Sequence, residues 1–110
     1  MLEGLFGNAT VEKVLLYLEQ YGEGYASEIA RAFDDLPVTM VQRQLDRLER
    51  GGIVASRLRG RTRVFVWSPR YAFLAELRAL LRRALRALPE TERRRYFSAR
   101  TRPRRTGKPY

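Results

Sequence analysis

Apolar residues recur at helical spacing in the first half of the chain. Val11, Val14, Leu15 and Leu18 fall on one side of a helix, which predicts a helix from Thr10 to Tyr21. Thr10 is the expected N-terminal cap, and Gly22 and Gly24 are expected to end the helix.

Two more helices follow in quick succession. The segment SEIARAF, residues 27–33, predicts a short helix, and the turn Asp34-Asp35-Leu36-Pro37 comes after it. The segment VTMVQRQLDRLER, residues 38–50, carries an apolar stripe of Val41, Leu45 and Leu48 and stops at Gly51-Gly52. The pattern predicts two helices joined by a tight turn.

The pattern then changes from helical spacing to β-type composition. IVASRL (53–58) and TRVFVW (62–67) are rich in β-branched and aromatic residues and flank Arg59-Gly60-Arg61. They predict a β-hairpin that Ser68-Pro69 closes. The fold class expected from these patterns is mainly α with a small β-hairpin.

The last strongly periodic segment is residues 70–88. Its apolar positions fall within about a third of the helix circumference; they are Phe73, Leu74, Leu77, Leu80, Leu81, Ala84, Leu85 and Leu88. Such a stripe is most often simple core, but this one is wider than a small domain needs. We therefore predict a homodimer with two-fold symmetry, whose contacts come from Phe73, Leu74, Leu77, Leu81 and Leu85.

Pro89 ends this pattern, and the chain continues as a basic segment with little to bury. We expect three parts: a domain of residues 1–69, a helix of residues 70–88 and a flexible tail of residues 89–110. The tail either contacts nucleic acid non-specifically or serves to keep the chain soluble.

Composition limits the chemistry. The 110 residues support one domain, and with no Cys and no His the chain lacks thiolate and imidazole groups. No catalytic residues, metal site or cofactor are therefore expected, and the chain is predicted not to be an enzyme. No apolar run approaches the ~20 residues of a membrane span, and MLEGLFGNATVEK does not resemble a signal peptide. We expect a cytoplasmic protein without membrane contact.

Charge is divided unevenly along the chain. Residues 1–36 hold 2 basic and 7 acidic side chains (net −5), whereas residues 37–110 hold 20 basic and 5 acidic ones (net +15). This asymmetry predicts a polyanionic partner that approaches one side of the molecule.

The order of helix, short helix, turn, helix, hairpin and helix is that of a winged helix-turn-helix domain. Residues 5–69 resemble transcriptional regulators of the ArsR-like type, through LFGNATVEKVLLYL, EIARAF, VTMVQRQLDRLERGGIV and RLRGRTRVFVWSP. The helix of residues 70–88 matches the place where such regulators carry a dimerisation helix. Asp34-Asp35 departs from the glycine that many members have in the turn, and metal sensing does not carry over because its Cys or His ligands are missing.

The resemblance implies that the helix of residues 38–50 enters the major groove of double-stranded DNA. It also implies that the tip of the hairpin, which is called the wing in such proteins, touches the backbone or minor groove. Since Val41, Leu45 and Leu48 face the core, the opposite side chains are free to contact base edges. Candidates on this helix are Thr39, Gln42, Arg43 and Arg47. Asp46 is expected to orient an arginine. The structural alternative is an ordinary solvated helix face.

Four arginines surround the predicted hairpin turn with no acidic residue between them, which favours phosphate contact; they are Arg57, Arg59, Arg61 and Arg63. The alternative explanation for these arginines is structural, because basic residues on edge strands also prevent strand-to-strand aggregation. Two other functions stay open: a winged-helix protein-interaction or adaptor module, and RNA binding through the basic tail. The sequence identifies no small-molecule or protein effector, operator or direction of regulation.

Overall fold

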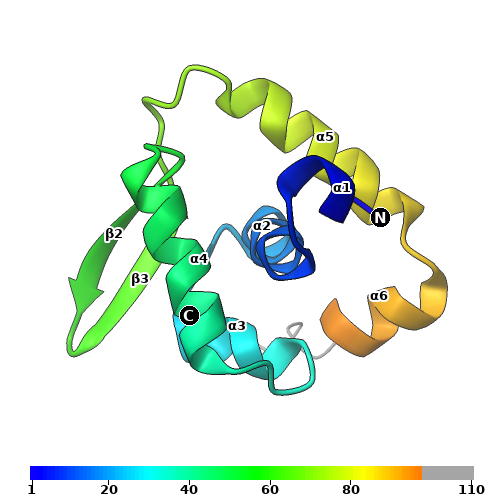
Figure 1. Ribbon diagram of the computed structural model, residues 1–110, viewed down its shortest axis with the longest axis horizontal. Coiled ribbons are helices and arrows are strands. Elements are labelled where there is room, and N and C mark those ends of the chain that lie inside the picture. Colours follow the sequence, from blue (N-terminus) through cyan, green and yellow to red (C-terminus); the bar gives the residue numbers. More distant parts are fainter. Residues whose placement is uncertain (98–110) are drawn as a thin grey trace, which may run out of the picture.

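The computed structural model describes residues 1–97, which form six helices and one small sheet. In chain order the elements are α1 (Glu3–Phe6), α2 (Ala9–Tyr21), β1 (Glu23–Gly24), α3 (Ala26–Ala32), α4 (Val38–Arg50), β2 (Val54–Arg59), β3 (Thr62–Trp67), α5 (Leu74–Ala87) and α6 (Glu90–Phe97). The prediction of a mainly helical fold with a small β-hairpin is confirmed. Figure 1 shows α2 end on at the centre, with the other helices around it and the β2–β3 hairpin projecting to one side.

Helix α2 forms the centre of the core because eight of its 13 residues are buried, six of them apolar. Val14, Tyr17 and Leu18 have no exposed surface at all. The helix starts one residue earlier than predicted, at Ala9, and Asn8 rather than Thr10 is its cap: the Asn8 Oδ1 atom accepts a hydrogen bond of 2.8 Å from the Val11 amide. Gly22 ends the helix in the left-handed conformation (φ 85°).

The sheet has three antiparallel strands in the order β1-β3-β2. The sequence predicted β2 and β3 but missed β1, which is only two residues long and pairs Gly24 with Phe65. A Cβ atom on Gly24 would lie 2.7 Å from the Cε1 atom of Tyr17. Glycine therefore lets β1 pass directly over the central helix.

The turn between α3 and α4 is unusual because two consecutive non-glycine residues have positive φ angles, Asp34 (61°) and Asp35 (59°). Aspartate tolerates this left-handed conformation better than most residues. The turn places Pro37 at the N-cap position of α4, which runs over the predicted residues Val38–Arg50. Val41, Leu45 and Leu48 are its buried residues, as predicted.

Helix α5 packs on α2 through its own apolar stripe. Leu81 has no exposed surface, and Ala84 is also buried. A second contact is ionic: the buried Glu19 carboxylate accepts hydrogen bonds from Arg78 (2.8 Å) and Arg82 (3.2 Å). The assignment of Leu81 to a dimer contact is therefore wrong, because its side chain is enclosed by the core of its own chain.

The segment after Pro89 forms a helix, α6, so the prediction of a flexible tail is wrong for residues 90–97. Phe97 is buried and packs edge to face on Phe33 with ring centroids 5.7 Å apart. Tyr96 lies against the same Phe33 ring at 5.0 Å. These aromatic contacts offset the cost of ordering a very basic segment. Residues 98–110 of the predicted tail lie outside the described residues.

Among residues 1–97, no helix is both long enough and apolar enough to cross a membrane.

Candidate nucleic-acid interface

The outer face of α4 forms a shallow depression of about 270 Å³. Its lining consists of Thr39, Gln42, Arg43, Asp46 and Arg50. These side chains lie together because they follow one another at three- and four-residue intervals on the side opposite the buried stripe. Three of the four residues predicted to contact bases, Thr39, Gln42 and Arg43, therefore share one surface.

Hydrogen bonds hold some of these side chains in place. The Gln42 amide nitrogen donates to Asp46 over 2.8 Å, which leaves the Gln42 carbonyl oxygen and its second N–H free to bond other groups. Asp46 thus orients a glutamine and not an arginine, contrary to the sequence prediction. Arg47, the fourth predicted residue, lies outside the depression and donates to Gln44 over 3.2 Å.

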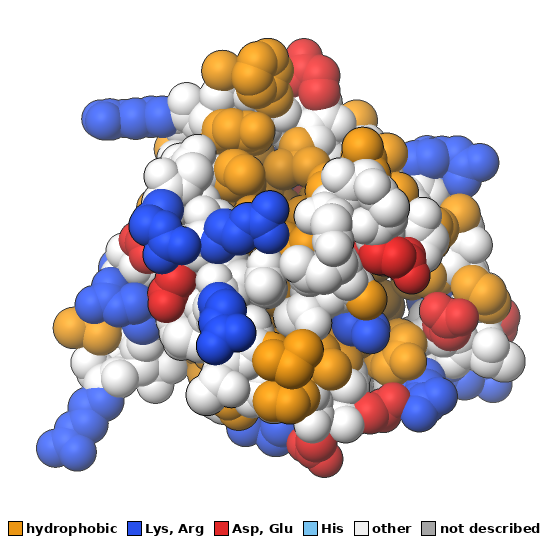
Figure 2. Space-filling model, viewed as in Figure 1, with side chains coloured by type: hydrophobic (Ala, Val, Ile, Leu, Met, Phe, Trp, Pro, Cys, Tyr) orange, Lys and Arg blue, Asp and Glu red, His pale blue; other side chains and the backbone are white. Residues whose placement is uncertain are grey.

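The remaining arginines of this face are uncompensated. Arg43 and Arg50 are exposed and form no hydrogen bond or ion pair with any other of residues 1–97. Arg50 is an addition to the residues predicted from the sequence, and its spacing from Arg43 and Asp46 places it on the same face. Figure 2 shows Lys and Arg side chains gathered over α4 on the face toward the viewer. The surface can therefore attract a polyanion.

The hairpin register divides the four wing arginines between two sheet faces. Paired residues of antiparallel strands project to the same face, and Leu58 pairs with Arg63 while Arg57 pairs with Val64. Arg63 therefore lies on the core face of the sheet with Ser56 and Phe65, whereas Arg57 and Arg59 lie on the opposite face. The four arginines predicted to contact phosphates therefore do not all project from one face of the hairpin.

Arg63 is tied to α4 by a chain of hydrogen bonds. Its guanidinium donates to the Ser56 hydroxyl over 3.0 Å, and that hydroxyl donates to the Glu49 carboxylate over 2.8 Å. Because Glu49 belongs to α4, these two hydrogen bonds connect the core face of the hairpin to the helix. Ser56 was not selected from the sequence, where no pattern distinguishes it.

Arg59 is already engaged with an acidic residue of the first strand. Its guanidinium donates two hydrogen bonds to the Glu23 carboxylate, over 2.8 and 3.2 Å. These hydrogen bonds raise the pKa of Arg59 above its usual value. The charge of Arg59 is therefore compensated by Glu23 of β1, so Arg59 is less available to a partner than an unpaired arginine.

Arg57 and Arg61 are the free cations of the wing. Both are exposed, and neither bonds to another residue of the described chain. The loop of the hairpin consists of Gly60 and Arg61. Gly60 has a positive φ angle of 66°, and Arg61 does not have a positive φ angle. This is the pattern of a type II′ hairpin turn, and it places Arg61 at the wing tip.

The predicted dimer contacts differ greatly in exposure. Phe73 is 64% exposed, and Leu80, a residue of the same stripe that was not predicted as a contact, is 36% exposed. Leu74, Leu77 and Leu85 are partly buried against the core. The part of the α5 stripe that another molecule could cover is therefore limited to its margin and its N-terminal end.

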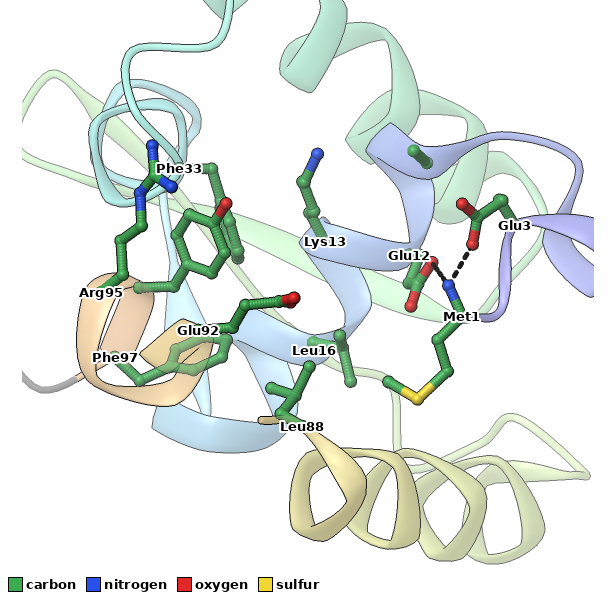
Figure 3. Close-up of a pocket in the computed structure, with 12 residues that line it drawn as sticks. Met1, Glu3, Glu12, Lys13, Leu16, Phe33, Leu88, Glu92, Arg95 and Phe97 are labelled. Atoms are coloured by element: carbon green, nitrogen blue, oxygen red, sulfur yellow. Dashed lines mark hydrogen bonds and ion pairs between the residues drawn. The ribbon is translucent and has the colours of Figure 1, made fainter. Parts of the chain in front are cut away.

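A separate cavity of about 290 Å³ lies beside α2 and α6. Figure 3 shows that its lining mixes apolar side chains, among them Leu16, Phe33 and Phe97, with charged ones such as Lys13 and Glu92. The carboxylates of Glu3 and Glu12 pair with the amino group of Met1. No residue of α4 or the wing lines it. Across residues 1–97, no group of three or more acidic side chains is placed to hold a metal ion.

A search of solved structures finds the same overall arrangement elsewhere. The crystal structure of the YusO protein from Bacillus subtilis matches with a TM-score of 0.58 and 24% sequence identity, over 83% of this chain and 72% of that chain. No protein-family model and no curated protein matches the sequence. The fold of residues 1–97 is that of a winged helix: α3 and α4 form the helix-turn-helix, and β2 and β3 form the wing.

Proposed function

We propose that this chain is a sequence-specific double-stranded DNA-binding transcriptional regulator of the ArsR-like winged-helix type, without enzymatic activity or cofactor. The observation that carries the proposal is the outer face of α4, where Thr39, Gln42 and Arg43 line one exposed depression. In the proposed complex α4 lies in the major groove and the wing lies on the backbone or in the minor groove.

The side chains on this face suit the chemistry of base edges. Glutamine forms paired hydrogen bonds with adenine, arginine does so with guanine, and threonine bonds a phosphate or meets a thymine methyl group. Gln42 is held in position by Asp46, so less side-chain freedom is lost when it binds. Arg43 is not engaged by any other of residues 1–97, so no ion pair has to break first.

Charge supports a nucleic acid over a neutral partner. Arg43 and Arg50 on α4 and Arg57 and Arg61 on the wing are exposed and unpaired within residues 1–97. By contrast, Arg78 and Arg82 of α5 are paired with the buried carboxylate of Glu19. Both elements that a winged-helix protein presents to DNA therefore carry uncompensated charge, although Arg70 before α5 and Arg83 and Arg86 on it are also exposed and form no ion pair within residues 1–97.

The test is competition for binding. A preferred duplex is selected from a random pool, and labelled duplex is then challenged with the same duplex, a random duplex and a structured RNA. We expect the selected duplex to compete at least 10³-fold better than random duplex. Equal competition by all three, or preferred binding of the RNA, would refute sequence-specific DNA binding.

Removing the wing-tip charge is expected to weaken binding to all duplexes alike. Arg61→Ala should lower the slope of log affinity against log salt by about 0.9, the value for one lost phosphate contact. Arg59→Ala is the matched control two residues away: because Arg59 is bound to Glu23, its loss should change the slope less. Affinity of both variants is measured by fluorescence anisotropy between about 50 and about 500 mM salt, a range of about one decade. An unchanged slope in Arg61→Ala contradicts the wing assignment.

The proposal includes a homodimer that uses the exposed margin of α5. We expect the chain to sediment as a dimer at micromolar concentration, and Phe73→Glu to shift it toward monomer, because a charge would be placed where the apolar ring is open. A dimer would set two α4 helices one helical turn apart, ~34 Å, on the duplex. Sedimentation of the unmodified chain as a monomer contradicts this part of the proposal only.

A further inference from the structure

Two apolar side chains are exposed at the start of α4. Val38 is 46% exposed and Met40 is 40% exposed, although the other apolar residues of this helix are buried in the core. Neither completes the buried stripe, which begins with Val41. Their apolar surface therefore contributes little to folding and remains open to a partner.

Their surroundings favour a nucleic acid as that partner. Met40 precedes Arg43 by three positions and Arg47 by seven, so it lies beside both on the helix surface. The first turn of α4 has no acidic residue, and its last turn carries Arg47 and Arg50. Figure 2 shows an apolar group where the α3–α4 turn leads into the helix, next to the Arg side chains over α4. Uncompensated arginines around an apolar surface fit a polyanionic partner that also offers apolar groups, as the major groove of DNA does.

We propose that Val38 and Met40 contact the 5-methyl groups of thymines in the major groove and thereby make binding depend on thymine at defined positions. This inference rests on the proposed function. A recognition helix contacts base edges with its N-terminal residues, and Val38 and Met40 belong to the first turn of α4. The thymine methyl is the apolar group among the base edges of the major groove.

The two residues also complement the polar contacts around them. Thr39 lies between them in sequence and lines the same depression as Arg43. A thymine methyl that packs on Met40 would exclude water from its neighbour's hydrogen bonds, which strengthens them. Guanine-directed contacts of Arg43 and thymine-directed contacts of Met40 would then fall on adjacent base pairs.

The experiment uses deoxyuridine, which differs from thymidine only by the absence of the 5-methyl group. In the duplex selected from the random pool, each thymine is replaced singly by uracil, and affinity for the unmodified protein is measured. We expect one or two positions per half-site at which uracil weakens binding about fourfold, the value for one buried methyl group. Other thymines should show no change.

The protein variants assign the effect to side chains. Met40→Ala and Val38→Ala should each lose the discrimination between thymine and uracil at one position and keep it at the other. Leu5→Ala removes a leucine that is 67% exposed on α1, outside the proposed DNA and dimer contacts, and serves as the matched control, which should retain both. Both α4 side chains are substantially exposed, so the fold should survive these changes.

The outcomes separate this inference from the function on which it rests. Specific duplex binding with equal affinity for thymine and uracil at every position overturns the inference and leaves the proposed function intact. A selected duplex without thymine, or full discrimination in both alanine variants, also overturns it. Failure to bind any duplex overturns the proposed function itself.

Discussion

Replacing Thr39, Gln42 and Arg43 together with alanine is expected to abolish the preference of the chain for its selected duplex. Two paired hydrogen-bond contacts with bases contribute about 1–3 kcal/mol each, and the threonine contact adds less. The expected loss is about 3–5 kcal/mol, which is a decrease in specific affinity of roughly 10²- to 10⁴-fold. Gel-shift titration with the selected and random duplexes measures it.

The expected loss concerns specificity and not stability. Thr39 and Arg43 are exposed and Gln42 is half-buried, so alanine at these positions leaves no core cavity. Binding to random duplex should fall less, because Arg50 and the wing arginines remain. Arg83→Ala is the control for loss of one exposed arginine outside the interface, since Arg83 lies on α5 and binds no other of residues 1–97. Specific binding that survives the triple change would remove the site assignment.

The sequence predicts α4 and the hairpin well because each has a strong local signal. Val41, Leu45 and Leu48 form the stripe of α4, and Gly51 ends the helix at Arg50, as expected. β2 and β3 follow from β-branched residues on either side of a glycine turn. Both patterns are short-range, so no knowledge of the tertiary structure is needed to find them.

The elements that the sequence misses depend on tertiary contacts. β1 consists of two residues, and it exists because Gly24 can approach Tyr17 closely and pair with Phe65. α6 is very polar, and its order comes from Phe97 and Tyr96 packing on Phe33, a residue more than sixty positions earlier. The local composition of a segment does not show which distant residues it will pack against.

In the candidate site, too, features with a local sequence signal were predictable and features that depend on tertiary contacts were not. The face of α4 follows directly from helical periodicity, which is why Thr39, Gln42 and Arg43 were found. The division of the wing arginines depends on the length of the loop: with a two-residue loop at Gly60-Arg61, Arg59 pairs with Thr62 and Arg63 with Leu58. A three-residue loop, as the sequence suggested, gives no such register. The ion pair of Arg59 with Glu23 depends on β1, which the sequence did not predict, so the ion pair could not be predicted either.

Leu81→Ala is expected to be the most destabilising change on α5. Leu81 is fully buried against the core, so truncation to alanine removes buried apolar surface and leaves a cavity. Such changes cost about 2–5 kcal/mol. For a chain of this size that corresponds to a fall in Tm of about 10 °C or more. Thermal unfolding followed by circular dichroism at a fixed protein concentration measures the fall.

Leu80→Ala is the informative neighbour, because Leu80 keeps 36% of its surface exposed on the same helix. If α5 is held by its own chain, through Leu81 and the Glu19 pair with Arg78, the cost at Leu80 should be much smaller. A larger loss at Leu80 than at Leu81 would contradict this account, because it would mean that the helix obtains most of its burial from a second molecule. A small loss at Leu80 that grows as the protein is concentrated would instead show that its exposed margin lies in the dimer contact, since only dimer stability depends on concentration.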